Sequence, residues 1–300
     1  MKKLFLIFVS SFLFAQINIK DLVDRIDLDG TSRKYLLKDE SPYSGIVFYN
    51  YTNGKKEFEG LLTEGIQDGR WMWFYENGTK KQEGFFYMNQ QTGLWTEWFS
   101  NGNYKSEGEY VNGMKQGTWS FWHESGGIAS AEPYREDKVH GKLVLWHDDG
   151  QKEGEALFVY GRKDGYDRGW YKDGSKQWEF YWSGDSKDSV HTRWYQDGQL
   201  LYIHHYTKGV PHGKQVEWFS NGVKSLDGEF HNGIYIGHWT WWYPDKTVAM
   251  EGEFALGNPR GNWIWITPGG DLENSEFPAL KWVENKIQVW ERAVSQRANQ

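Results

Sequence analysis

A glycine recurs every 24 residues along most of this chain. The positions are Gly54, Gly78, Gly102, Gly126, Gly150, Gly174, Gly198, Gly222 and Gly270. Only Lys246 interrupts the series. A fixed period of this size is typical of proteins built from stacked structural repeats. Because such an array grows by addition, the 300 residues need no internal domain boundary.

The periodic glycines predict β-hairpins. Most of them follow Asn or Asp, and Asn-Gly and Asp-Gly are the pairs preferred in two-residue type I′ turns. A second glycine row lies between them and marks the opposite turns: Gly69, Gly93, Gly117, Gly141, Gly165, Gly213, Gly237 and Gly261. The segments between the turns are rich in Trp, Tyr and Phe and fit short strands. We therefore expect an all-β fold, an elongated and curved antiparallel sheet of stacked hairpins.

The repeats share more than their glycines. The pattern Gly-x-Trp-x-x-Trp-aromatic-x-Asn-Gly, followed by Glu-Gly, is clear from Gly69 to Gly78, from Gly93 to Gly102 and from Gly117 to Gly126. This pattern resembles the MORN-repeat variant family, which includes YwqK-type antitoxins, over roughly residues 43 to 270. The resemblance implies a single sheet of hairpins with a role in binding or scaffolding. For MORN proteins generally it also implies protein interaction and membrane attachment.

Four middle repeats depart from the pattern. Where the regular repeats have Trp seven places before the turn, they carry Leu143, Asp167, His191 and Gln215. The second Gly of Glu-Gly is lost in the same part of the chain. We expect a regular Trp to lie opposite that Gly across the hairpin, because a large ring complements a missing side chain. The middle repeats should therefore form a distinct block.

One aromatic row persists through the middle block, four residues before each turn. After Phe74 it consists of Trp98, Trp122, Trp146, Trp170, Trp194, Trp218 and Trp242. Each is followed by Tyr, Phe or His, and successive strand residues point to opposite faces. Either the Trp row fills the space between hairpins, or it forms an exposed track with rings about 9.6 Å apart, suited to an extended glycan. These seven Trp are the candidate ligand-binding residues.

No residue pattern indicates catalysis or metal binding. An acidic row recurs at Glu59, Glu83, Glu107, Glu155, Glu179, Asp227 and Glu251. Glycosidase chemistry needs two carboxylates in one cleft, so a ladder of single carboxylates is better explained by pairing with Lys56, Lys81, Lys105 and Lys152. The nine His form no zinc motif, and nucleophile and phosphate-loop motifs are absent. We predict no catalytic residue, no metal and no cofactor.

The first fifteen residues predict export. Met1-Lys2-Lys3 is basic, Leu4 to Phe14 is apolar, and Ala15 precedes Gln16, as in a signal peptide. We therefore expect a periplasmic, cell-surface or secreted protein, with no transmembrane span once the signal is removed. The net charge of −7 argues against nucleic acid as a partner. The remaining partners are an unknown protein, an envelope polysaccharide or, by resemblance, the membrane surface.

Both ends are expected to cap the array, since terminal hairpins would otherwise expose an unpaired edge. The predicted parts are a signal peptide at 1–15, an N-terminal cap at 16–44, about ten hairpin repeats at 45–270, and a C-terminal capping helix within 271–300. The helix is predicted by apolar residues at three- and four-residue steps: Leu280, Val283, Ile287, Trp290 and Val294. The alternative is that this helix docks a partner.

Three functions remain open. The first is an exported, non-enzymatic scaffold that binds a protein at the cell envelope. The second is a binder of envelope glycans through the aromatic track. The third, implied by the family resemblance, is an antitoxin-like inhibitor of a protein toxin.

Overall fold

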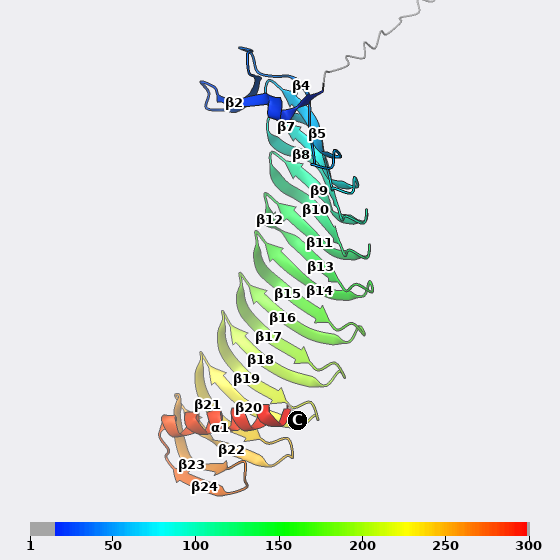
Figure 1. Ribbon diagram of the computed structural model, residues 1–300. Coiled ribbons are helices and arrows are strands. Elements are labelled where there is room, and N and C mark those ends of the chain that lie inside the picture. The colour runs from blue at the N-terminus through cyan, green and yellow to red at the C-terminus, as the bar shows by residue number, and fades with distance from the viewer. Residues whose placement is uncertain (1–15, 299–300) are drawn as a thin grey trace, which may run out of the picture. The chain divides into compact units, whose positions relative to one another are not determined.

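The computed structural model describes residues 16–298, and most of this part is β-strand (Figure 1). The predicted signal peptide, residues 1–15, lies outside the described residues. The chain divides into two compact units, residues 1–138 and 139–300. Each unit is an array of antiparallel hairpins, and a helix follows the second array. The predicted all-β hairpin fold with a C-terminal helix is thus confirmed.

The first unit begins with a short segment that precedes the array. It contains β1 (Ile17–Asn18), the 3₁₀ turn η1 (Ile19–Asp21), and a hairpin of β2 (Leu22–Ile26) and β3 (Ser32–Leu36). Strand β1 pairs in parallel with the first strand of the array. The array strands are β4 (Gly45–Asn50), β5 (Lys56–Thr63), β6 (Ile66–Phe74), β7 (Lys80–Tyr87), β8 (Gln90–Trp98), β9 (Tyr104–Val111), β10 (Met114–Trp122) and β11 (Ile128–Arg135).

The second unit follows the short strand β12 (Lys138–Val139). Its strands also pair antiparallel with their neighbours in the chain. They are β13 (Gly141–Trp146), β14 (Lys152–Val159), β15 (Arg162–Trp170), β16 (Lys176–Ser183), β17 (Ser186–Trp194), β18 (Leu200–Thr207), β19 (Val210–Trp218), β20 (Lys224–His231), β21 (Ile234–Trp242), β22 (Val248–Ala255), β23 (Asn258–Ile266) and β24 (Leu272–Glu276). Helix α1 (Leu280–Ala298) ends the unit.

The Asn-Gly turns are not the predicted two-residue turns. In the β6–β7 hairpin, the amide of Gly78 donates to the carbonyl of Tyr75, and the amide of Tyr75 donates to Thr79. Gly78 has φ +92°, whereas Asn77 is not among the residues with positive φ. This is a three-residue loop whose last residue is left-handed. Asn77 acts through its side chain, because its Oδ1 accepts from the amide of Thr79.

The two-residue turns lie at the opposite end of each hairpin. Between β9 and β10, both central residues have positive φ, with Asn112 at 51° and Gly113 at 78°. Glu64 and Gly65 repeat this at 50° and 76°. Positive φ at both central positions is the requirement of a type I′ turn. The fold therefore contains the predicted type I′ turns, but they lie at the Asn112-Gly113 end of the hairpins and not at the Asn-Gly pairs of the 24-residue series.

Side chains at the Asn-Gly turns join each repeat to the next. The hydroxyl of Tyr75 donates to the carbonyl of Trp98 at 2.8 Å, and the side-chain amide of Asn77 donates to the backbone carbonyl of Ser100 at 3.0 Å. Tyr195 repeats the first bond with the carbonyl of Trp218 at 2.9 Å. Because every step spans 23 residues, the turn sequence that closes one hairpin also fixes the position of the next.

In the first unit, the predicted cap packs on one face of the opening hairpins. Leu22 of β2 is buried with Val47, Leu62 and Trp71 of the array. In the second unit, α1 packs on its last hairpins with the predicted apolar side, where Val283 and Trp290 are buried. Burial of two side chains of this size stabilises the unit by roughly 3–6 kcal/mol. The apolar side of α1 is thus occupied within this chain.

Candidate functional site

In the regular repeats, a Trp ring covers a glycine of the preceding strand. Trp71 covers Gly60, and Trp95 covers Gly84; a Cβ built on either glycine would lie 2.0 and 2.2 Å from the ring. Trp71 is in register with a glycine on each neighbouring strand, with Gly84 of β7 as expected and also with Gly60 of β5. Its ring lies over Gly60 and not over Gly84. We call the side of the sheet that carries these rings the indole face, defined by Trp71, Trp95, Trp119, Trp239 and Trp263.

Two residues of the middle block reproduce the polar contact of the missing Trp. The indole Nε1 of Trp95 donates to the carbonyl ten residues earlier, that of Phe85, at 3.1 Å. His191 Nε2 lies 2.7 Å from the carbonyl of Tyr181, and Gln215 Nε2 donates to that of His205 at 2.9 Å. Since a carbonyl only accepts, His191 carries its proton on Nε2. Burial, to 1% exposure, lowers the pKa of His191.

Asp167 replaces the Trp differently, because a carboxylate cannot donate. Its Oδ1 accepts from Trp178 Nε1 at 2.9 Å, and its Oδ2 pairs with Lys163. Asp167 is buried, with 7% of the residue surface exposed. The ring of Trp178 lies over Gly169, where a Cβ would come within 2.3 Å of it. In this repeat the ring that covers a glycine therefore comes from β16. The position that holds Trp in the regular repeats holds no aromatic ring.

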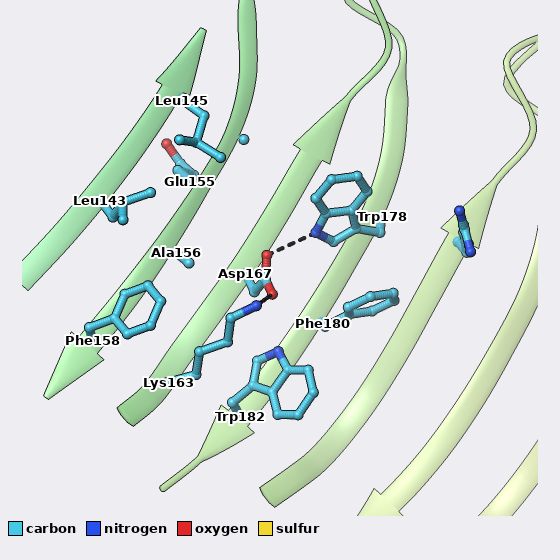
Figure 2. A pocket seen from close by; sticks show the side chains of 12 residues that line it. Leu143, Leu145, Glu155, Ala156, Phe158, Lys163, Asp167, Trp178, Phe180 and Trp182 are labelled. Carbon is cyan, nitrogen blue, oxygen red and sulfur yellow. Dashed lines mark hydrogen bonds and ion pairs between the residues drawn. The ribbon is translucent and has the colours of Figure 1, made fainter. Parts of the chain in front are cut away.

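The loss of the Trp side chains leaves a hollow of about 560 Å³ on the indole face of the second unit. Figure 2 shows its side chains on β13 to β16, with Asp167 between Lys163 and Trp178. Most of the lining is apolar. It consists of Leu143, Leu145, Gly154, Glu155, Ala156, Phe158, Lys163, Asp167, Trp178, Phe180, Trp182 and Arg193. A volume of this size lies within the ordinary range of ligand sites.

The charged groups around the hollow are unevenly paired. Glu155 pairs with Lys142 at 2.8 Å and also with Lys152 and Arg168. Burial alone would raise the pKa of Glu155, but hydrogen bonds from the two lysines outweigh it and the pKa is lowered. Arg193, which is exposed, has no carboxylate within 4.0 Å among residues 16–298. The hollow therefore has one unneutralised cation at its margin.

The predicted Trp row lies on the other side of the sheet. All seven members, Trp98 to Trp242 in steps of 24, are half-buried. The ammonium of Lys80 lies 5.3 Å from the ring centre of Trp98, and Lys152 and Lys176 lie similarly over Trp170 and Trp194. These lysines also pair with the acidic row. The Trp row is thus half-buried, with lysines over at least three of its rings.

The acidic row forms ion pairs, though not always with the predicted lysine. Glu59 pairs with Lys56 as expected. Glu83 pairs with Lys80 at 2.6 Å rather than with Lys81, and Lys105 pairs with Glu97 at 3.1 Å. Within residues 16–298, no three His, Asp or Glu side chains gather in a way that could hold a metal ion.

No helix in residues 16–298 is long and apolar enough to cross a membrane.

Comparison with known proteins identifies the type of repeat. Residues 67–89, 91–112 and 187–208 each match a family model described as MORN repeat variant. A search of curated proteins finds no match. One similar solved structure is titled "Crystal Structure of TcdB2-TccC3-TEV", with 11% identity, 82% of this chain covered and a TM-score of 0.19. The match spans 16% of the length of that solved chain.

Proposed function

From the premise that three repeats of this chain match the MORN repeat variant model, we propose a non-enzymatic scaffold that binds a partner protein on the indole face of its second unit. The observation that carries the proposal is the hollow around Asp167, where apolar side chains line an open surface. Apolar groups left open on a sheet are commonly interaction sites. Repeat arrays also provide the extended surfaces that protein partners need.

The regular repeats support this location by contrast. Their indole face is filled by Trp rings and, near α1, is covered by buried residues such as Val283 and Trp290. Around Asp167 the Trp rings give way to Leu143 and Asp167 itself, whose side chains are smaller than an indole. An inhibitor of a protein toxin would be one case of such a scaffold, with the toxin as the bound partner.

Site-specific cross-linking tests this location. A benzophenone side chain in place of Phe158 lines the hollow, whereas one in place of Leu157, its 42% exposed neighbour, faces the other side of the sheet. We expect Phe158 to yield a cross-linked protein after irradiation of cells that produce the chain, and Leu157 to yield none. Cross-links from Leu157 alone, or from neither position, would overturn the proposal.

We also propose that the scaffold acts outside the cytoplasm, at the cell envelope. The support is the basic start and apolar run of residues 1–15, which have the pattern of a signal peptide. Cell fractionation should place the chain in the envelope or medium, shorter by about fifteen residues. A version without residues 1–15 should remain in the cytoplasm, and equal distribution of the two versions would contradict export.

Glycan binding by the Trp row is the second candidate, favoured by the partial exposure of its seven rings. A sugar would have to displace lysines such as Lys152 from the ring of Trp170. Trp fluorescence of residues 16–300, titrated with peptidoglycan fragments and polysaccharides, separates the candidates. A saturable blue shift that is lost in Trp170→Ala supports a glycan track. An unchanged spectrum removes this candidate and leaves the protein partner.

A further inference from the structure

The hollow has spare hydrogen-bond donors but no spare carboxylate. Both oxygens of Asp167 are used, one by Trp178 and one by Lys163. Glu155 is engaged by three basic side chains. A ligand that needs to donate hydrogen bonds, such as a sugar hydroxyl or an amine, would have to compete with these internal partners.

Two groups of the lining lack an acceptor. Arg193 on β17 is the cross-strand neighbour of Trp178, and it has no ion-pair partner in the described part of the chain. The Nε1 of Trp182 is buried without an acceptor among these residues. Guanidinium and indole nitrogens only donate hydrogen bonds. Because Arg193 is exposed, its guanidinium is free to donate to a bound molecule, so the lining favours a ligand that accepts hydrogen bonds.

The shape adds an apolar requirement. Leu143, Leu145 and Phe158 line one part of the hollow, and Phe180 and Trp182 line another. The space of about 560 Å³ opens on the sheet face and is not enclosed by chain. It therefore accommodates one or two apolar side chains of a longer molecule that continues across the surface. In Figure 2 the labelled aromatic rings border this space beside Asp167 and Lys163.

We propose that the hollow recognises a polypeptide segment in which an apolar side chain is followed closely by a carboxylate of Asp or Glu. The apolar side chain enters between Leu145 and Phe180, and the carboxylate pairs with the guanidinium of Arg193. This rests on the proposed function, since it specifies the chemistry of the protein partner. Arginine suits this role because its planar fork can bind a carboxylate through two parallel hydrogen bonds.

Paired peptides test the chemistry directly. The chain from residue 16 to 300 is titrated by calorimetry with hexapeptides that each carry one Leu or Phe. The set places a Glu at each position near the apolar residue in turn, and every peptide has a matched partner with Gln in place of that Glu. We expect the Glu peptides to bind about tenfold more tightly than the matched Gln peptides, as for a charge-assisted pair. Arg193→Gln should remove this difference. Arg260→Gln, which also changes an exposed arginine of the second unit, should retain it.

A second variant fills the hollow without removing Arg193. Ala156 and Asp167 are in register, as Gly60 and Trp71 are in a regular repeat. The double substitution Ala156→Gly and Asp167→Trp therefore rebuilds the regular pair. We expect it to abolish binding of every peptide in the set, with a melting temperature that is not lower than that of the parent chain.

Several results would overturn this inference. They are equal affinity for Glu and Gln peptides, no binding by any peptide, unchanged discrimination in Arg193→Gln, or equally tight binding of free 3-phenylpropionate, which would indicate a small-acid site. A partner cross-linked at Phe158 together with such a result would leave the scaffold proposal standing. Absence of any cross-link at Phe158 would instead remove the scaffold proposal itself.

Discussion

Gly84 lies so close beneath the indole of Trp95 that a Cβ on this glycine would be 2.2 Å from ring atom Cδ2. The same relationship joins Trp119 to Gly108 and Trp239 to Gly228. Trp119 and Trp239 thus pack on the backbone of a glycine, and the indole N–H of each donates to a carbonyl of the same preceding strand. The regular repeat is built around this pair, and the candidate site is formed where the pair is absent.

Gly84→Ala should destabilise the first unit by about 2 kcal/mol, because the methyl group and the ring of Trp95 cannot both fit. The matched control is Gly154→Ala, where the nearest atom to the new Cβ is a carbonyl oxygen at 3.4 Å. Urea unfolding of the two variants measures the difference. Similar losses in both would show that the ring moves aside at little cost.

Lys246→Gly should stabilise the chain. Lys246 occupies the turn position of the periodic glycines with φ +74°, a left-handed conformation that costs a side-chain-bearing residue about 1–2 kcal/mol. Part of this gain is offset by the greater freedom of glycine in the unfolded chain, so we expect a net gain of about 0.5–1 kcal/mol. Thermal and urea unfolding both measure it. A loss of stability would mean that the Lys246 side chain contributes more than its backbone strain removes.

Tyr195→Phe should cost about 1 kcal/mol, because it removes the hydrogen bond to the carbonyl of Trp218 at 2.9 Å. Tyr195 is half-buried, and this burial raises the pKa of its hydroxyl. Tyr104→Phe is the control, since this ring is 49% exposed. Equal stability of the two variants would argue against the inter-repeat ladder as a stabilising feature.

His191 should make stability depend on pH near neutrality. Burial lowers the pKa of His191 below its ordinary value of 6.5, so the folded state favours the neutral ring. Its contribution is fully present above pH 6.5 and is lost as the pH falls, since the unfolded chain then binds the additional proton. We expect a loss of roughly 1 kcal/mol between pH 7.5 and 5.5.

His191→Gln provides the comparison for this pH dependence. Gln215 occupies the same repeat position and donates to the equivalent carbonyl, so Gln can retain the hydrogen bond to Tyr181 without titrating. The free energy of unfolding, measured in urea at both pH values, should change less in the variant than in the parent. An identical change would assign the pH dependence to other groups.

Much of the fold could be predicted because its signals are local. The 24-residue spacing, the turn residues and the strand-forming aromatics each act within a few residues, and the apolar steps from Leu280 to Val294 define a helix by themselves. The ionic partners could be predicted only in part. Glu83 lies within reach of several basic residues, and only the register of β6 with β7 places Arg70 beside it.

The sequence by itself determined the period, the hairpins, the terminal helix and the distinct middle block, since each depends on residues near one another in the chain. Tertiary structure decided which glycine each Trp ring covers and where the type I′ turns lie. It also decided that Asp167, Trp178 and Lys163 meet at one hollow. These outcomes depend on side-chain packing between strands, where the space vacated in one strand is filled, or left open, by residues of its neighbours.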